Sequence, residues 1–238
     1  MTPAPADPAL IDKLVLANRI LYRQGVVDAF GHVSVRHDRS PDHFLLARNM
    51  APALVRREDI VTYDLDGAAL DAAGRRVYLE RFIHAEIYRA RPDVQSVVHS
   101  HSPNVIPFGV TGTALRPIFH MSGFLAEGST LFEIRDVAGD TDMLISNARL
   151  GEALAAALGP RSTVLMRGHG STVVGASLEQ AVYRAIYAEV NARLQTQARQ
   201  LGDVTYLNAN EAAKAAAIND TQLPRVWELW AREIGAVE

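Results

Sequence analysis

The sequence predicts one α/β domain with a central sheet that is mostly antiparallel or mixed. Three observations lead to this fold class. The chain has 238 residues, 48% of them apolar, which is enough to bury a large core without a disulfide or a structural metal. Strand-like and helix-like apolar patterns alternate along the chain. No internal repeat, low-complexity linker or long charge run divides it, so we expect a single domain over residues 1–238.

The first half of the chain contains one helix, three strands and a second helix. Leu10, Leu14, Ala17 and Leu21 are spaced by three and four residues, which is typical of one helical face, and Gly25 ends this helix. Short runs of β-forming residues then predict strands, and a second helical pattern stops before a proline. In chain order these elements are a helix at 9–24, strands at 32–36, 43–47 and 60–65, and a helix at about 79–90.

The second half adds two strands and four helices. The apolar pattern is nearly continuous over 163–167, as expected of a strand that is buried on both faces. In chain order the elements are a strand at 94–100, a helix at about 147–158, the strand at 163–167, and helices at 177–200, 210–217 and about 224–234.

Composition excludes several classes of function. The net charge is −3, from 24 Lys+Arg and 27 Asp+Glu, and the chain has no basic stripe, so no nucleic-acid partner is expected. The absence of cysteine excludes thiolate nucleophiles and cysteine zinc sites. Lys13 and Lys214 are the two lysines, and neither has the sequence context of a Schiff-base amine in an apolar pocket. The first residues do not resemble a signal peptide and no run of eighteen apolar residues occurs, so we expect a cytoplasmic protein without membrane contact.

Three histidines could converge at the ends of two predicted strands. His99 and His101 flank Ser100, and residues two apart in a strand point to the same face. His169 follows the 163–167 strand between two glycines, which let the backbone approach closely. Three imidazoles with an open fourth position are typical of a catalytic divalent-metal site. The simpler alternative is that the His-x-His pair is only a polar strand end.

Glu80 lies at the start of the helix predicted before the 94–100 strand. A carboxylate beside a bound dication stays ionised, so Glu80 could act as a general base or as a fourth ligand that the substrate displaces. The alternative is a favourable charge in a helical first turn. The ligand set suits one divalent metal per subunit, Zn²⁺ or Mn²⁺, with Fe²⁺ and Co²⁺ as further candidates.

The motifs resemble those of the class II aldolase/adducin family. The resemblance rests on the order and spacing of four segments: Ala29–Arg36, which is similar to the glycine-containing substrate loop, Leu79–His84, Val98–Pro103 and Arg167–Gly170. It spans about residues 10–200. It implies a three-layer α/β/α sandwich around a mostly antiparallel sheet, assembled as a homotetramer with active sites between neighbouring subunits. It also implies the residue roles: the metal is held by His99, His101 and His169, and Glu80 is the acid/base residue.

Departures from the sugar-phosphate aldolase pattern are informative. The serine pair and the Thr-Gly turn that bind phosphate in those aldolases correspond here to Tyr78-Leu79 and to residues 48–53. The asparagine of the substrate loop is replaced by His32, and the tyrosine proton donor by His120. These changes resemble a branch that decarboxylates hydroxylated aromatic dicarboxylates, such as dihydroxyphthalates or a hydroxypyridine dicarboxylate, in aromatic compound catabolism.

That branch implies further roles in binding a small carboxylate substrate. His120 or His32 would assist proton transfer or bind a carboxylate, and Ser34 lies in the substrate loop. Arg48 and Arg81 could clamp the second carboxylate through a planar fork.

The helices after about residue 200, with Tyr206, could cap the site of a neighbouring subunit. His84, four residues beyond Glu80, is expected either to orient a ligand or to be a buried helix histidine with a backbone partner.

Two other functions remain open. The same metal could serve an aldolase or epimerase acting on a sugar phosphate or a hydroxy-keto acid, because retro-aldol cleavage and β-keto acid decarboxylation both leave electrons on an enolate. A non-catalytic scaffold of the adducin type would keep the fold without the metal site.

Overall fold

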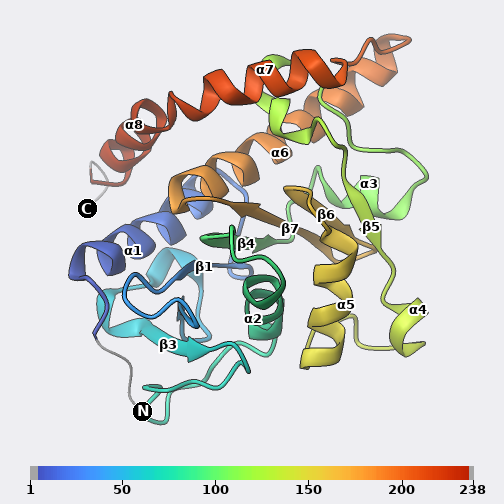
Figure 1. The fold of residues 1–238 in the computed structure, drawn as a ribbon. Helices are drawn as coiled ribbons and strands as arrows, with labels where there is room; N and C mark the ends of the chain where they lie inside the picture. Colours follow the sequence, from blue (N-terminus) through green and yellow to red (C-terminus); the bar gives the residue numbers. More distant parts are fainter. Residues whose placement is uncertain (1–4, 236–238) are drawn as a thin grey trace.

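A computed structural model describes residues 5–235, so the two ends of the single domain expected over 1–238 lie outside the described residues (Figure 1). The core is one seven-stranded sheet with the order β3-β2-β1-β4-β7-β6-β5. Neighbouring strands are antiparallel except for β5 and β6, which are parallel, so the predicted mostly antiparallel sheet is confirmed. The strands are β1 (His32–Arg36), β2 (His43–Ala47), β3 (Ile60–Asp64), β4 (Ser96–Ser100), β5 (Thr130–Phe132), β6 (Thr163–Met166) and β7 (Gly170–Gly175).

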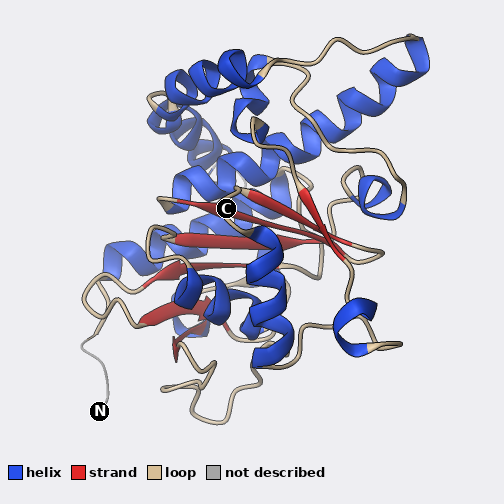
Figure 2. Ribbon diagram, turned by 45° about the vertical axis from the view of Figure 1, so that its right-hand side comes forward, coloured by secondary structure: helices blue, strands red, loops and turns tan. Residues whose placement is uncertain are grey.

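Helices cover both faces of this sheet, which confirms the three-layer sandwich (Figure 2). One layer contains α2 (Arg81–Ala90) and α5 (Ala148–Leu158), which pack against each other. The other contains α1 (Pro8–Arg23), α6 (Leu178–Leu201) and α8 (Leu223–Gly235). Shorter elements connect them: α3 (Ile106–Val110), α4 (Arg135–Ala138), α7 (Ala209–Asp220) and the 3₁₀ turns η1 (Pro52–Leu54), η2 (Arg57–Asp59) and η3 (His120–Leu125).

Polar caps explain where the long helices begin. Asp7 precedes α1 and its carboxylate accepts the N–H of Ala9, while Pro8 occupies the first helical turn, where its missing N–H costs nothing. Ser177 caps α6 in the same way through the N–H of Gln180. These caps determine where the two helices begin. The predicted boundaries of the helices differ from the observed ones by at most three residues.

The centre of the sheet brings the ends of two strands together. β4 pairs with β1 on one side and with β7 on the other, and His99 faces His32 and Thr172 in these two registers. Ser100, the last residue of β4, pairs with Ser171. The residues just beyond these partners, at the end of β4 and before β7, therefore lie side by side.

Two strands were not predicted. β7 reads GSTVVG, in which a glycine stands at each end and the β-branched run has only three residues, Thr172–Val174. Its six residues are nevertheless all buried, because β7 is enclosed between β4 and β6. β5 has only three residues. In the part of the chain that the structure describes, no helix is long and apolar enough to span a bilayer.

Candidate metal centre

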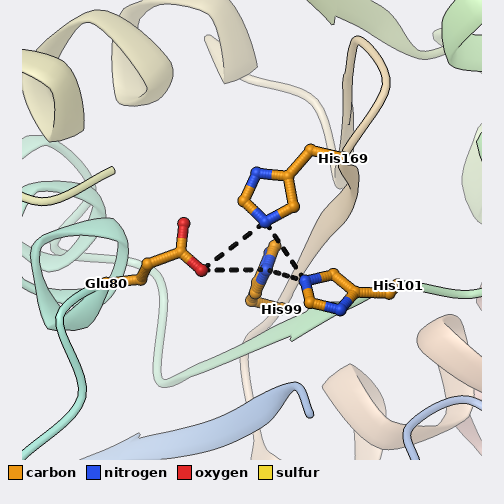
Figure 3. A group of neighbouring side chains, drawn as sticks. All are labelled: Glu80, His99, His101 and His169. Carbon is orange, nitrogen blue, oxygen red and sulfur yellow. Dashed lines mark hydrogen bonds and ion pairs between the residues drawn. The ribbon is translucent and has the colours of Figure 1, made fainter. Parts of the chain in front are cut away.

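Three imidazoles and one carboxylate converge on one point (Figure 3). Each of Glu80, His99, His101 and His169 offers one ligand atom, and these atoms all lie within 4.8 Å of one another. The Nε2 atoms of His99 and His101 are 3.3 Å apart, and those of His101 and His169 are 3.1 Å apart. Oε2 of Glu80 lies 3.6 Å from Nε2 of His99 and 3.5 Å from Nε2 of His169. The four predicted metal-site residues are thus brought together.

These spacings fit a bound divalent metal. Nitrogen and oxygen ligands about 2.0–2.1 Å from a tetrahedral zinc ion lie about 3.3–3.4 Å from one another. The four distances between neighbouring ligand atoms, 3.1–3.6 Å, bracket that value. The donor set of three nitrogens and one carboxylate oxygen also suits Zn²⁺ or Mn²⁺. The chain therefore carries a candidate divalent-metal site.

Each ligand comes from the end of a regular element. His99 is the fourth residue of β4, and His101 follows the end of that strand. His169 occupies the tight turn between β6 and β7, where its N–H donates to the carbonyl of Met166 (3.1 Å) and Gly168 adopts a positive φ of 63°. Glu80 is the N-cap residue of α2. Rigid strand and helix ends thus hold the four side chains.

Gly170 allows the two strand ends to approach each other. A Cβ atom at this residue would overlap with the backbone carbonyl oxygen of Ser100, which belongs to the neighbouring strand and cannot move aside freely. Only glycine therefore permits this pairing, and the pairing brings His169 beside His101.

The surroundings of His99 and His101 favour their neutral forms. His99 is fully buried, and desolvation lowers its pKa well below the usual value. Burial and the neighbouring imidazole of His169 lower the pKa of His101 as well. Neutral imidazoles keep the lone pairs that metal binding requires.

Glu80 is held ionised. Burial alone would raise its pKa, but hydrogen bonding to His169, electrostatic interaction with the nearby rings of His99 and His169, and the N–H of Ile145 together lower the pKa to about 2. The Ile145 N–H donates to Oε1 (3.0 Å), which leaves Oε2 facing the histidines. Met143, two residues before Ile145, adopts a positive φ of 72°, which is uncommon for a residue with a side chain. The loop before α5 therefore orients the carboxylate.

His32 lies beside this cluster, and its neighbours differ from the expected ones. Its ring centroid is 5.1 Å from that of His99 and 4.6 Å from that of Tyr78. Its Nδ1 forms a 2.6 Å hydrogen bond with Nε2 of His84. His84 was expected to have a backbone partner or to orient a metal ligand, but its two nitrogens contact the side chains of His32 and Ser34.

Ser34 was predicted to bind substrate, and the structure gives its hydroxyl other partners. The residue has no exposed surface, and its hydroxyl is engaged by Nδ1 of His84 (2.6 Å) and by the Tyr88 hydroxyl (2.7 Å). It belongs to β1, whose five residues are all buried. Ser34 forms a hydrogen bond with His84, which in turn forms one with His32.

The two predicted carboxylate-binding arginines have different surroundings. Arg48 is partly exposed and pairs through Nε with Asp59 (2.6 Å). Arg81 donates from Nε to the carbonyl of Gly67 (2.6 Å) and from Nη1 to the carbonyl of Tyr78 (3.0 Å). Arg81 is thus engaged by the backbone before α2, and the structure favours Arg48 of the two as a carboxylate ligand.

His120 and Tyr206 do not join the cluster within one chain. His120 is exposed on η3, where its carbonyl accepts a hydrogen bond from Asn219 of α7 (2.7 Å). The Tyr206 ring is covered by the guanidinium of Arg116, 4.0 Å from its centroid, and its hydroxyl accepts from Gln195 of α6 (3.2 Å). Among the described contacts, neither side chain touches a candidate metal ligand.

Two contributors to the site were not predicted. The Ile145 N–H is a backbone group, so no residue type marks it in the sequence. Tyr88 lies eight residues after Glu80 on α2 and contacts Ser34 on β1, a relationship that only the packing of helix on sheet creates. The apolar helical pattern around Tyr88 predicts burial but not a partner.

Comparisons with known proteins show the family of the chain. Residues 12–196 match the family model described as the class II aldolase and adducin N-terminal domain. A decarboxylase, tropJ, from Talaromyces stipitatus is 40% identical over 239 residues, which cover 90% of this chain and 90% of that protein. A 3,4-dihydroxyphthalate decarboxylase from Arthrobacter keyseri is 33% identical and covers 80% of this chain and 79% of its own length.

Solved structures show the same fold. An aldolase II superfamily protein from Pseudomonas syringae superposes with a TM-score of 0.81 at 23% identity, covering 98% of this chain and 95% of that one. An L-fuculose 1-phosphate aldolase from Glaciozyma antarctica superposes with a TM-score of 0.79 at 24% identity, covering 99% of this chain and 96% of that one. At these identities the likeness concerns the architecture alone.

Proposed function

Because the chain belongs to the decarboxylase branch of the class II aldolase/adducin family, we propose that it is a divalent-metal-dependent carboxy-lyase acting on a hydroxylated aromatic dicarboxylate. The observation that carries this proposal is the convergence of Glu80, His99, His101 and His169. The similarity to a 3,4-dihydroxyphthalate decarboxylase supports a dihydroxyphthalate as the substrate. A hydroxypyridine dicarboxylate is the second candidate, from the resemblance in the sequence.

The reaction is a carbon–carbon cleavage. In an ortho-hydroxy aromatic acid, the keto tautomer places the departing carboxylate β to a carbonyl. Forming this tautomer moves a proton onto the ring carbon that bears the carboxylate. Loss of carbon dioxide then leaves the bonding electron pair in the ring as a phenolate, and a proton on its oxygen gives the phenol. A divalent metal held by the four residues would supply positive charge that stabilises these electrons.

Glu80 and His32 supply proton transfer and orientation in this proposal. The ionised carboxylate of Glu80 accepts a proton at Oε2 and returns it to the ring carbon. His32, beside His99, binds an oxygen of the substrate. Burial of Glu80, His99 and His32 limits water near the reacting atoms and strengthens their electrostatic effect.

Arg48 recognises the second carboxylate in this proposal. Its Nε pairs with Asp59, which fixes the side chain, and charge-assisted hydrogen bonds from the other nitrogens would bind a carboxylate. Tyr78 connects His32 with the segment that follows Arg48: its ring centroid is 4.6 Å from that of His32, and its hydroxyl donates to the Met50 carbonyl (2.5 Å).

We further propose a homo-oligomer, a tetramer as in the resemblance, in which sites lie between subunits. The exposure of His120 on η3 supports this, because a proton donor outside its own chain's cluster could serve the cluster of a neighbour. Tyr206 and the helices after α6 would lie at the same contact.

A substrate screen tests the function. The metal-loaded protein is incubated with 3,4-dihydroxyphthalate, with a hydroxypyridine dicarboxylate and with a dihydroxyacetone phosphate adduct, and carbon dioxide and aldehyde are measured. The proposal predicts carbon dioxide from an aromatic dicarboxylate. Aldehyde without carbon dioxide would indicate an aldolase, and neither product would favour a non-catalytic role.

A further inference from the structure

Four buried side chains form a continuous hydrogen-bonded chain below the candidate metal centre. The hydroxyl of Tyr88 contacts Oγ of Ser34 (2.7 Å), and the same Oγ contacts Nδ1 of His84 (2.6 Å). Nε2 of His84 then contacts Nδ1 of His32 (2.6 Å). None of the four residues is more than 3% exposed. We call these residues the Tyr88–His32 chain.

Both imidazoles in this chain are neutral. Burial disfavours the charged ring, and it lowers the pKa of His84 to about 3. His32 is also buried, with 3% of its surface exposed, and its ring lies against that of His84, 4.7 Å away between centroids. A neutral imidazole carries one hydrogen, so one nitrogen donates and the other accepts. Each contact in the chain therefore has a defined direction.

The far end of the chain determines that direction. Tyr88 must donate its hydroxyl hydrogen, and Ser34 Oγ is the acceptor beside it among the described residues. No other described group lies within hydrogen-bonding reach of this hydroxyl as an acceptor. Because a buried unpaired donor is costly, the hydrogen of Tyr88 points to Ser34.

The remaining hydrogens follow from this one. Ser34 accepts from Tyr88, so its own hydrogen goes to Nδ1 of His84. His84 then carries its hydrogen on Nε2 and donates it to Nδ1 of His32. The hydrogen of His32 must be on Nε2. In the reverse arrangement the Tyr88 hydrogen has no acceptor among the described residues, and in a mixed one the Ser34 hydrogen has none.

We propose that Tyr88, Ser34 and His84 are positioning residues that hold His32 as the tautomer with its hydrogen on Nε2. His32 then presents a fixed N–H donor next to His99, suited to a carboxylate or a developing oxyanion of the substrate. The tautomer of His32 follows from the hydrogen bonds of the Tyr88–His32 chain alone. That its Nε2–H binds a substrate rests on the proposed function.

This assignment also explains why three histidines, and not four, form the candidate ligand set. The His32 ring is only 5.1 Å from that of His99. A nitrogen that bears hydrogen cannot donate a lone pair to a metal, and the other nitrogen of His32 is engaged by His84. The Tyr88–His32 chain thus makes His32 a hydrogen-bond donor, whereas the neighbouring His99, His101 and His169 keep a nitrogen lone pair for the metal.

Nitrogen NMR of the zinc-loaded, ¹⁵N-histidine-labelled protein tests the proposal. Protonated and bare imidazole nitrogens have well-separated shifts, and the His32 and His84 signals are assigned by their loss in His32→Asn and His84→Gln. We expect a hydrogen on Nε2 and a bare Nδ1 in both rings. A hydrogen on Nδ1 of His32 would overturn the proposal. This readout needs no turnover, so it stands apart from failure of the decarboxylase function.

Tyr88→Phe gives a second test, because it removes only the terminal hydroxyl. We expect the nitrogen shifts of His32 and His84 to move toward the average of two tautomers, with metal content unchanged. With a substrate that releases carbon dioxide, we expect kcat/KM to fall about fivefold, the equivalent of one ordinary hydrogen bond. Tyr183→Phe is the matched control: Tyr183 is buried and donates to the Met121 carbonyl (2.9 Å), outside the chain. Unchanged tautomers in Tyr88→Phe would contradict the proposal.

Discussion

His101 Nε2 and His169 Nε2 lie 3.1 Å apart, although 68 residues separate the two histidines in the sequence. Antiparallel pairing of β4 with β7 creates this proximity, since Ser100 and Ser171 are partners in the register and the histidines lie just outside that pair. The pairing of these two strands therefore builds the candidate metal centre.

Removing two ligands should abolish metal binding. In a His99→Ala/His169→Ala variant, two of the four donors are lost, and we expect the bound metal to fall from about one per chain to near zero. Elemental analysis of the purified protein measures this. His43→Gln, a histidine of β2 outside the cluster, is the control and should keep its metal. Full metal content in the double variant would show that the site lies elsewhere.

Replacing Glu80 by glutamine should lower the catalytic rate while the fold around the residue is kept. Glu80→Gln keeps the side-chain oxygen that accepts from Ile145, so the loop before α5 keeps its partner. It removes the ionised base, and we expect kcat for carbon dioxide release to fall by about 10²–10⁴-fold. Steady-state kinetics check this, with circular dichroism as the control for folding. A variant with wild-type kcat would remove Glu80 from the mechanism.

The close approach at Gly170 should be essential for both stability and metal binding. Gly170→Ala forces a methyl group against the Ser100 carbonyl, so we expect about 2–4 kcal/mol less free energy of unfolding and weaker metal affinity. Urea unfolding and metal titration measure the two effects. Gly112→Ala is the matched control, because no atom lies within 4 Å of its added methyl group. Equal stability of the two variants would contradict this explanation.

Buried His84 should make the protein sensitive to acid. The unfolded chain protonates this histidine below about pH 6.5, whereas the folded chain keeps it neutral down to about pH 3. The unfolded state therefore binds more protons in this range, and the free energy of unfolding falls as the pH falls.

A His84→Gln variant isolates this contribution. We expect the slope of the unfolding free energy between pH 6 and pH 4 to be smaller by about 1.4 kcal/mol per pH unit than in the unaltered protein. Urea unfolding of both metal-free proteins at several pH values gives the two slopes. Parallel curves would mean that His84 is protonated equally in both states.

The sequence predicted those parts of the fold and site that depend on local pattern. The periodicity of residues 9–24 and 177–200 gave helices close to α1 and α6. His99 and His101 were expected to converge because of their spacing, and their Nε2 atoms are 3.3 Å apart. The mostly antiparallel sheet also agreed with the prediction.

The features that were missed depend on tertiary contacts. β7 is a strand because β4 and β6 enclose it, although its first residues have weak strand propensity. Ser34 occupies a position in the substrate-loop motif, but the packing of α2 on β1 buries it against His84 and Tyr88. No single-residue pattern encodes such a contact, since the partners are 50 and 54 residues away.

Carbon dioxide release before and after metal removal tests the central claim most directly. The protein is dialysed against a chelator until elemental analysis finds no metal, and it is assayed with 3,4-dihydroxyphthalate before and after one equivalent of Zn²⁺ or Mn²⁺ is added back. We predict loss of carbon dioxide release on chelation and its recovery on reconstitution. Undiminished release from the metal-free protein would contradict a role for His99, His101 and His169 as metal ligands in the reaction.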